Sequence, residues 1–218
     1  MYLIIGYGMS GKGVAHFLTE QTQPFGVFDD KLTEEKPFFY HTYTPHFLNE
    51  KEITTIIKSP GVPYHHPLIQ DALSQNIPVI TDIELYARHL NNPIIGITGT
   101  NGKTTTTTLV DRMFAGAKLP HVTGGNIGHS LGEDMAKLKE NEHVLLELSS
   151  FQLKGTKNFR PKIGCLLNLS PTHLDFHGNF GDYADSKMNL FQNQQKEDVA
   201  ILPYALKHFK EQYELKGK

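Results

Sequence analysis

The chain has 218 residues, of which 39% are hydrophobic and 20% are charged, and its formal net charge is −2. This length suffices for one large or two small domains, and the small net charge argues against a cation-rich surface that binds nucleic acid. No apolar stretch approaches the length of a membrane span, and Met1 leads into a strand-like segment instead of a signal peptide. We therefore expect a cytoplasmic globular protein that binds neither nucleic acid nor membranes. The single cysteine, Cys165, lies in an apolar run and is expected in the core.

The first thirty residues have the pattern of a βαβ unit. Residues 2–5 predict a strand, GYGMSG at 6–11 predicts a glycine turn, and residues 25–28 predict a second strand that ends at Asp29 and Asp30. This spacing is typical of a dinucleotide-binding fingerprint, in which an acidic side chain contacts the ribose. The alternative is a tight turn between strand and helix that binds no ligand.

The next sixty residues continue an α/β pattern. Residues 31–50 give no clear prediction, but residues 53–57 predict a strand that runs into a sharp Ser-Pro-Gly turn. Such a turn lies at the carboxyl edge of a sheet, where open α/β sheets bind ligands. His65 and His66 follow on a proline-flanked loop, and we expect them to be solvated, because a closed metal site needs several converging ligands. The predicted elements that complete this part are a helix at 68–73, a strand at 78–80 and a helix at 83–90.

The polar turn Asn91-Asn92-Pro93 is the predicted domain boundary, because proline cannot continue the preceding helix. It is followed by PIIGITGTNGKTTTTT at 93–108, which predicts a strand, a glycine loop and a helix. Backbone N–H groups of such a loop surround phosphate oxygens, a lysine reaches the outer phosphates, and a hydroxyl can bind Mg²⁺. Lys103 and Thr104 fit these two roles. The alternative is a glycine-rich turn without a ligand.

The helix after this loop is expected to be amphipathic, with an apolar face formed by Leu109, Val110, Met113 and Phe114. The loop itself is one residue tighter than the general phosphate-binding pattern, because Ile97 and not a glycine lies five positions before the last loop glycine.

Two later strands end in side chains that could bind a cation. Glu147 interrupts the apolar run 143–148, and a buried carboxylate is costly unless it is paired or bound to a cation such as Mg²⁺. The alternative is a side chain that extends to solvent where the strand ends. His173 and Asp175 follow the predicted strand 163–169 and could reach the same cation, or could lie on a solvated loop.

The remaining predicted elements are a helix at 183–191 that contains Lys187, a strand at 198–202 and a final helix at 206–218.

Several separated segments resemble the Mur ligases of bacterial peptidoglycan synthesis, in the order and spacing of that family. They are GITGTNGKTTTT (96–107), GGNIG (124–128), LELSSFQL (146–153), NLSPTHLDFHG (168–178) and YADSKMNLF (183–191). LELSSFQL is most similar to the family member that adds D-glutamate to UDP-N-acetylmuramoyl-L-alanine. In that member the first domain is Rossmann-like and holds UDP instead of NAD, which is compatible with GYGMSG.

The resemblance implies an α/β protein with a Rossmann-like UDP-substrate-binding domain at 1–92 and a P-loop ATP-binding central domain at 93–218. The central domain would be truncated and the family's C-terminal ligase domain absent, so we expect weak or no ligase activity from this chain alone. The resemblance also implies a monomer, with ATP and Mg²⁺ as cofactors.

The resemblance assigns roles to individual residues. Lys103, His173 and Lys187 would be catalytic, and Lys187 matches the lysine that the family carbamylates with CO₂, which would turn a cation into an oxygen ligand for Mg²⁺. The residues implied for ATP are Gly99, Thr100, Asn101, Gly102, Lys103, Thr104 and Thr105; those for the metal are Thr104, Glu147, His173 and Lys187; those for the UDP-muramoyl substrate are Ser10, Asp29, Asp30, Gly61, Asn126 and Ser149.

The implied reaction is the formation of an amide through an acyl phosphate.

One departure from the family concerns the metal site, because Thr172 stands before His173 where relatives have aspartate. The alternative within the resemblance is another member of the family. The alternatives from the residues are an NAD-dependent dehydrogenase built on the first glycine turn, a general P-loop nucleotide hydrolase, and a nucleotide-binding fragment without catalysis.

Overall fold

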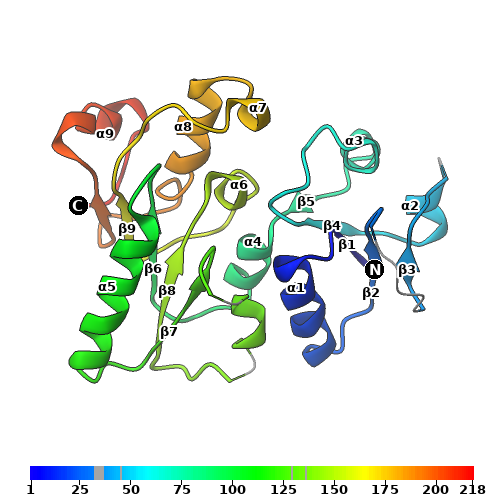
Figure 1. The fold of residues 1–218 in the computed structure, drawn as a ribbon, viewed down its shortest axis with the longest axis horizontal. Helices are drawn as coiled ribbons and strands as arrows, with labels where there is room; N and C mark the ends of the chain where they lie inside the picture. The colour runs from blue at the N-terminus through cyan, green and yellow to red at the C-terminus, as the bar shows by residue number, and fades with distance from the viewer. Residues whose placement is uncertain (32–36, 45, 129, 136) are drawn as a thin grey trace.

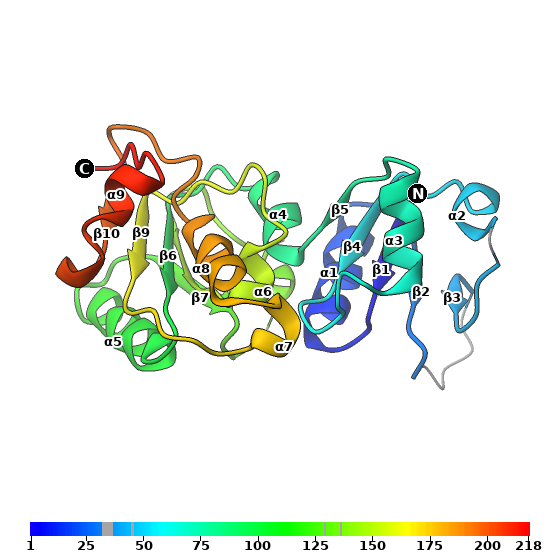
Figure 2. The ribbon, with the colours of Figure 1, turned by 90° about the horizontal axis from the view of Figure 1, so that it is seen from above.

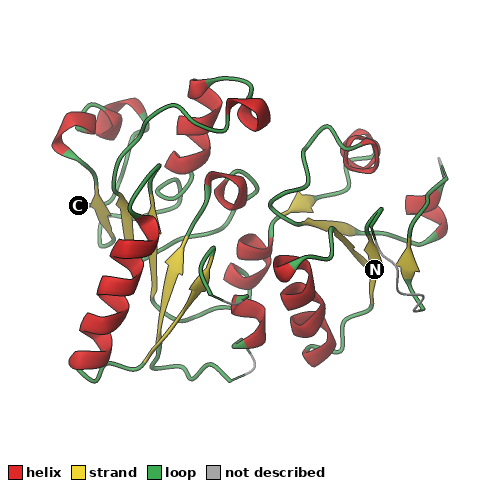
Figure 3. Ribbon diagram, in the orientation of Figure 1, coloured by secondary structure: helices red, strands yellow, loops and turns green. Residues whose placement is uncertain are grey.

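The computed structural model describes residues 1–31, 37–44, 46–128, 130–135 and 137–218. Within them the chain forms two five-stranded parallel sheets that lie side by side (Figure 1). Helices flank each sheet (Figure 3). The α/β class predicted from the sequence is therefore confirmed. No helix in the described ranges is both long enough and apolar enough to cross a bilayer.

The first sheet has the strand order β3-β2-β1-β4-β5. Its strands are β1 (Tyr2–Ile5), β2 (Phe25–Phe28), β3 (Phe39–Tyr40), β4 (Thr55–Lys58) and β5 (Val79–Ile80), and its helices are α1 (Met9–Glu20), α2 (Phe47–Glu50), α3 (Pro67–Ser74) and α4 (Asp82–Ala87). The β1 and β2 predictions are confirmed residue for residue. The register pairs Ile5 with Phe28 and with Lys58, so the residues that follow these three strands meet at one edge.

The second sheet has the order β10-β9-β6-β8-β7. Its strands are β6 (Ile94–Thr98), β7 (His121–Gly125), β8 (His143–Glu147), β9 (Ile163–Leu166) and β10 (Val199–Ile201), and its α-helices are α5 (Lys103–Gly116), α6 (Ser150–Leu153), α7 (Leu174–His177), α8 (Phe180–Met188) and α9 (Phe209–Gln212). Two short 3₁₀ helices span Leu131–Glu133 and Tyr204–Leu206. β6 is the central strand, and its carboxyl end pairs with those of β8 and β9.

The buried face of α5 differs from the predicted one. Val110 and Phe114 pack against the apolar side chains of β6 and β8, as expected. Leu109 and Met113 are instead 58% and 62% exposed, and Thr107 is fully buried. The helix begins at Lys103, which fixes its rotation, so Thr107, Val110 and Phe114 share the inner face at helical spacing.

The predicted helix at 206–218 is wrong over most of its length. Only Tyr204–Leu206 and Phe209–Gln212 are helical. The final residues run beside β10 instead: the Lys218 N–H donates to the Asp198 carbonyl, and the Ala200 N–H donates to the Lys218 carbonyl. These hydrogen bonds to the edge strand satisfy the N–H and carbonyl groups of Lys218, which in a helix would bond to neighbouring turns.

The two sheets share one continuous core. A single cluster of buried apolar side chains runs from β1 and α1 through α4 to β8. α1 and α4 lie between the sheets (Figure 2). α1 approaches the 130–132 segment so closely that a Cβ added to Gly13 would lie 1.8 Å from the Ser130 hydroxyl oxygen. The predicted boundary at Asn91–Pro93 falls between the last strand of the first sheet and the first strand of the second.

Candidate active site

The loop between β6 and α5 is shaped by glycine and by a neighbouring asparagine. Gly102 has φ +80°, a conformation that side chains rarely adopt. The Asn168 side chain accepts from the Asn101 N–H at 2.9 Å and donates to the Asn101 carbonyl at 3.0 Å. The Lys103 ammonium donates to the carbonyl oxygens of Gly99 (2.9 Å) and Thr100 (3.0 Å), so it lies within the loop. The loop thus joins a parallel strand to the amino end of a helix and holds one cation, which is compatible with the predicted phosphate loop.

The hydroxyl side chains predicted to accompany this lysine lie in the first turn of α5. Thr104 and Thr105 are both exposed there. Their position at the amino end of a fourteen-residue helix places them beside backbone N–H groups that carry partial positive charge.

Glu147 ends β8 with its carboxylate buried. The side chain is 1% exposed, so it does not extend to solvent. Its Oε1 accepts from the Asn126 amide nitrogen at 2.8 Å, whereas Oε2 is buried without a hydrogen-bond partner among the described residues. Gly125 permits the backbone to lie close to Glu147, because its φ is +96° and an added Cβ would lie 2.3 Å from the Glu147 carbonyl oxygen. A buried carboxylate oxygen without a protein partner has the chemistry that Mg²⁺ requires.

Lys187 on α8 is buried and faces the same loop. The ammonium donates to the Gly99 carbonyl oxygen at 2.9 Å and to the Thr98 hydroxyl oxygen at 3.2 Å. Burial, together with the nearby charge of Lys103, lowers the pKa of Lys187 to about 7. A helical lysine is ordinarily a solvated surface residue, so this placement indicates a specific role.

His173 is the N-cap of α7 and has φ 52°, in the left-handed region. Its ring contacts the rings of Phe151 (centroids 5.0 Å apart) and Tyr183 (6.4 Å). His173 and Asp175 are exposed, and Thr172 is half-buried. No group of three or more His, Cys, Asp or Glu side chains in the described ranges is close enough to hold a metal ion. The proposed metal set of Thr104, Glu147, His173 and Lys187 therefore stays a prediction.

One buried histidine was not singled out from the sequence. His177 Nδ1 lies 2.7 Å from the Asp182 carboxylate, and Nε2 lies 3.0 Å from the Ser150 hydroxyl oxygen. The Lys154 ammonium donates to both oxygens of the same carboxylate. Burial lowers the pKa of His177, with the hydrogen bond to Asp182 acting in the opposite direction. Its partners Ser150 and Asp182 come from α6 and α8, so no spacing within one predicted element pointed to this histidine.

The segment after Glu147 is held by a capping box. The Ser149 hydroxyl accepts from the Gln152 N–H at 3.3 Å, and the Gln152 side-chain oxygen accepts from the Ser149 N–H at 3.1 Å. Ser149 is thus fixed two residues beyond Glu147 at the carboxyl end of β8.

A cavity of about 240 Å³ opens at the carboxyl edge of the first sheet. It brings together Asp29, Asp30 and Gly61, all predicted for the UDP-muramoyl substrate. Lys31 and His66 also line it, and the sequence did not point to either. The Asp29 carboxylate accepts from the N–H groups of Tyr7 (2.7 Å) and Lys31 (2.9 Å), so it fixes the glycine turn.

Ser10, the remaining residue predicted for that substrate, is not among the residues that line this cavity. Its side chain hydrogen-bonds to Asp82, whose pKa is raised by burial. Gly11 fits the third position of the glycine turn, because an added Cβ would lie 2.0 Å from the Gly6 carbonyl oxygen.

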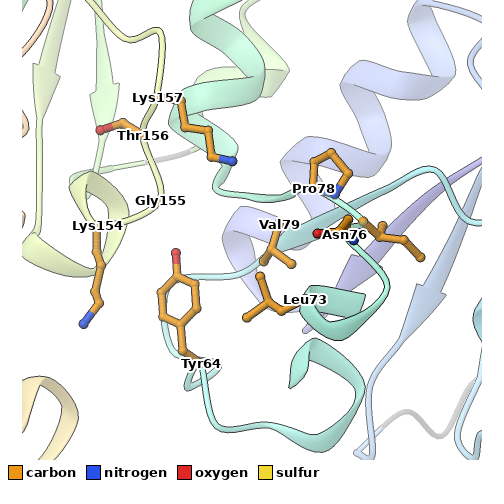
Figure 4. A pocket seen from close by; sticks show the side chains of 10 residues that line it. Tyr64, Leu73, Asn76, Pro78, Val79, Lys154, Gly155, Thr156 and Lys157 are labelled. Atoms are coloured by element: carbon orange, nitrogen blue, oxygen red, sulfur yellow. The ribbon is translucent and has the colours of Figure 1, made fainter. Parts of the chain in front are cut away.

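A larger cavity, of about 460 Å³, lies at the seam between the two sheets (Figure 4). Residues 73 and 76–79 line one side, residues 154–157 line the other, and Tyr64 points toward Gly155. It contains none of the residues predicted for ATP, metal or substrate, so it is separate from the candidate active site.

Comparison with known proteins identifies both halves of the chain. Residues 97–217 match the family model described as Mur ligase middle domain, and residues 1–81 match the model described as Mur ligase MurD-like, N-terminal domain. The chain is 37% identical over 212 residues to the UDP-N-acetylmuramoylalanine--D-glutamate ligase of Streptococcus mutans, which covers 93% of this chain and 47% of that protein. It is 38% identical over 211 residues to the protein of the same name from Bacillus pumilus, covering 92% and 47%. The chain thus spans about half the length of these curated relatives.

Two solved structures share the fold. One is the UDP-N-acetylmuramate:L-alanyl-gamma-D-glutamyl-meso-diaminopimelate ligase from Neisseria meningitides, with a TM-score of 0.63 and 16% identity over 100% of this chain and 76% of that one. The other is a murein peptide ligase from Psychrobacter arcticus, with a TM-score of 0.59 and 14% identity over 97% and 51%. At these identities the likeness concerns the fold alone.

Proposed function

This chain belongs to the Mur ligase family, and from that premise we propose that it carries the nucleotide-substrate and ATP sites of a ligase that adds D-glutamate to UDP-N-acetylmuramoyl-L-alanine. The observation that carries the proposal is Glu147. Its buried Oε2 has no hydrogen-bond partner among the described residues. Glu147 ends β8, which pairs with β6, the strand that precedes the glycine loop. A free carboxylate oxygen beside the glycine loop supports a magnesium–nucleotide site, because Mg²⁺ prefers oxygen ligands.

In the proposed reaction, an oxygen of the substrate's terminal carboxylate attacks the γ-phosphorus of ATP, and ADP leaves. The nitrogen of D-glutamate then attacks the acyl carbon, phosphate leaves, and the nitrogen releases a proton as the amide forms. Lys103, whose ammonium lies in the loop, would hold the phosphate oxygens on which negative charge develops. Mg²⁺, when bound, neutralises charge on the same phosphates.

One contact and one lowered pKa further support this assignment. Asn126 is held against Glu147, so a substrate group bound by Asn126 would lie beside the phosphate loop. Lys187 has a pKa of about 7, so a large fraction of its amine is neutral near pH 7 and able to react with CO₂. A carbamate at this position would supply an anionic oxygen to the metal.

The first test is binding, because the chain spans about half of its curated relatives. We would titrate the purified chain with UDP-N-acetylmuramoyl-L-alanine by calorimetry, with UDP and NADH as comparators. Binding of the muramoyl compound and of UDP, without binding of NADH, is the expected result. Binding of NADH alone would exclude the UDP site and favour a dehydrogenase.

A second titration tests the ATP site in the same chain. A non-hydrolysable ATP analogue with Mg²⁺ is expected to bind the unmodified chain and to bind much more weakly to Lys103→Ala, because the ammonium that lies in the loop is lost. Equal binding by both proteins would contradict the role of this loop. Glutamate-dependent release of ADP by the chain would show that it also catalyses the reaction without further residues.

A further inference from the structure

Lys58, the last residue of β4, is a buried lysine that has no role in the proposed reaction. Its ammonium donates to the carbonyl oxygens of Ser59 (3.1 Å) and Pro60 (3.3 Å), and no carboxylate lies within ion-pair distance of it in the described part of the chain. Burial lowers the pKa of Lys58 to about 8, with Asp82 acting in the opposite direction. At pH 7 the side chain is thus mainly charged, and a buried charge is costly unless other groups stabilise it.

Two aromatic rings, one from each part of the chain, stabilise this charge. The Lys58 ammonium lies 5.0 Å from the centroid of the Tyr64 ring and 5.6 Å from that of the Phe176 ring. Tyr64 belongs to the connection between β4 and α3, whereas Phe176 lies on α7 in the part of the chain that forms the second sheet. A cation over an aromatic ring is attracted by its electron-rich face, most strongly away from water. Lys58 therefore joins the two parts of the chain.

A second cation reaches the same two rings. The Lys154 ammonium lies 5.7 Å from the centroid of the Tyr64 ring and 6.0 Å from that of the Phe176 ring, and its charge is paired with the Asp182 carboxylate. Tyr64 and Lys154 come from the two sides of the seam between the sheets (Figure 4). We call the group formed by Lys58, Tyr64, Lys154 and Phe176 the seam contact.

In the first part of the chain, Lys58 holds the turn that borders the predicted substrate cavity. The two carbonyl groups that accept from its ammonium belong to this turn, and Gly61, predicted for the substrate, is the next residue. The Ser59 hydroxyl donates to the Gly6 carbonyl oxygen at 2.7 Å, so the same turn is fixed against the first glycine turn. The position of the Lys58 side chain therefore affects the shape of the predicted UDP site.

On α7, the seam contact lies next to His173, which is predicted for the metal. The Phe176 N–H donates to the His173 carbonyl oxygen at 3.2 Å. The Phe151 ring contacts both the Phe176 ring (centroids 4.5 Å apart) and the His173 ring (5.0 Å apart). A continuous series of contacts thus leads from the first glycine turn through Lys58 to His173, between the two predicted ligand sites.

We propose that Lys58 is a positioning residue that couples the two sites, so that a nucleotide bound at the first sheet strengthens the binding of Mg²⁺–ATP at the second, and the reverse. The ligand that binds first orders the seam contact, and the second ligand then binds to a contact that is already ordered. Such coupling is reciprocal, because both ligands share one thermodynamic cycle. Neither ligand needs to touch Lys58. This inference rests on the proposed UDP-substrate and ATP sites.

The test measures by calorimetry the affinity of the chain for UDP, with and without a saturating non-hydrolysable ATP analogue and Mg²⁺. UDP is the probe because it lacks the muramoyl-alanine part, whose terminal carboxylate would approach ATP directly. Lys58→Met removes the charge and keeps an unbranched apolar side chain, whereas Lys58→Arg keeps a cation that stacks on aromatic rings. Lys51→Met is the matched control, because the Lys51 ammonium also lies over a ring, that of Tyr40 at 5.5 Å, but within the first part of the chain.

The unmodified chain, Lys58→Arg and Lys51→Met are expected to bind UDP at least about fivefold more tightly with the ATP analogue than without it. In Lys58→Met this ratio of affinities should fall below about twofold, because the seam contact loses the cation that joins its two rings. The ratio separates coupling from structural support, since a variant that is only less well folded loses affinity for UDP equally with and without the analogue. Thermal unfolding of each variant measures any such loss.

Phe176→Leu tests the contact from α7, and it replaces Lys58→Met if that variant does not fold. It should lower the ratio to the same extent, and the double variant should show no further loss, because both changes remove one interaction. An unchanged ratio in Lys58→Met, an equal loss in Lys51→Met, or a ratio near one in the unmodified chain would overturn the inference. Failure of the unmodified chain to bind UDP would instead remove the UDP-substrate site, and the coupling with it.

Discussion

The ammonium nitrogen of Lys187 lies 2.9 Å from the carbonyl oxygen of Gly99, although the two residues come from a helix and a loop 88 positions apart in the sequence. This contact joins α8 to the glycine loop that opens the second sheet. Tyr183, one turn earlier on α8, makes a second link through its hydroxyl to the Thr100 hydroxyl, at 3.0 Å. The loop and α8 therefore hold one another in position, and we expect a substitution on α8 to alter the conformation of the loop.

Lys187 is expected to form a carbamate. Because burial and Lys103 lower its pKa to about 7, raising the pH from 6 to 8 converts most of the amine from the charged to the neutral form, which is the form that reacts with CO₂. We expect a carbamate carbon signal in the ¹³C NMR spectrum of the chain in ¹³C-bicarbonate at pH 8. Lys187→Arg should lack it, because a guanidinium stays charged. The same signal in Lys187→Arg would assign it to another lysine.

Glu147→Gln is expected to have opposite effects on stability and on binding. The substitution removes a buried negative charge whose Oε2 lacks a partner, so the chain without Mg²⁺ should gain about 1 kcal/mol in free energy of unfolding. Affinity for a Mg²⁺–ATP analogue should fall about tenfold or more, because an amide is a weaker ligand than a carboxylate. Denaturant unfolding without metal and calorimetric titration with Mg²⁺ measure the two effects.

The exposed Glu140 provides the control for this experiment, and Glu140→Gln should change neither quantity. Loss of stability in Glu147→Gln without metal would mean that the carboxylate is stabilised by the protein itself, which would argue against a cation site there.

Glu84 is expected to be a main stabilising contact between the two parts of the chain. Its carboxylate on α4 is fully buried, and one oxygen accepts from three consecutive N–H groups, those of Lys157 (2.8 Å), Asn158 (2.9 Å) and Phe159 (3.2 Å). Glu84→Gln should lower the free energy of unfolding by about 2 kcal/mol, because an amide accepts these bonds less strongly and brings its own donors. The matched change at the exposed Glu20 should have an effect below about 0.5 kcal/mol. Urea unfolding followed by circular dichroism compares the two, and similar values for both would contradict this role.

The regular elements were predictable from the sequence where the pattern is local. β1 and β2 are short apolar runs, followed by Gly6 and Asp29, and both were predicted residue for residue. β3 has only two residues, which is too short for an alternating or apolar pattern to predict it, and it depends on pairing with β2. β3 forms because its backbone pairs with β2, and this pairing arises only when the chain folds.

In the candidate site too, local patterns in the sequence were predictive and contacts between distant segments were not. Lys103 and Glu147 were predicted because a glycine loop and an acidic residue in an apolar strand are visible over a few residues. His177 was missed because its partners, Ser150 and Asp182, come from separate segments that meet only in the fold. His66 was expected to be solvated, but its position is set by a helix cap and by a ring on β2. Tertiary contacts of this kind leave no signal at fixed spacing.

The Asp198 side chain is expected to make the stability of the second sheet depend on pH in the acid range. Burial raises its pKa, but hydrogen bonds from Arg160 (2.6 Å), the Gln195 N–H (2.8 Å) and Lys162 (3.0 Å) outweigh burial, and the pKa falls to about 2. The ordinary value in an unfolded chain is about 3.9. A depressed pKa contributes stability that is fully present above about pH 4 and is lost as the pH falls from about 4 to 2.

Asp198→Asn should therefore destabilise the chain by about 1–3 kcal/mol at pH 7, because it removes the negative charge that these three donors share. The difference from the unmodified chain should shrink as the pH falls toward 2, where the native carboxylate is itself becoming protonated. Urea unfolding of both proteins at pH 7, 5 and 3 measures the difference, and Glu211→Gln, at an exposed position, serves as the control. A difference that stays constant from pH 7 to 3 would show that the asparagine acts through packing, and that the charge of Asp198 contributes little to the stability of this edge of the sheet.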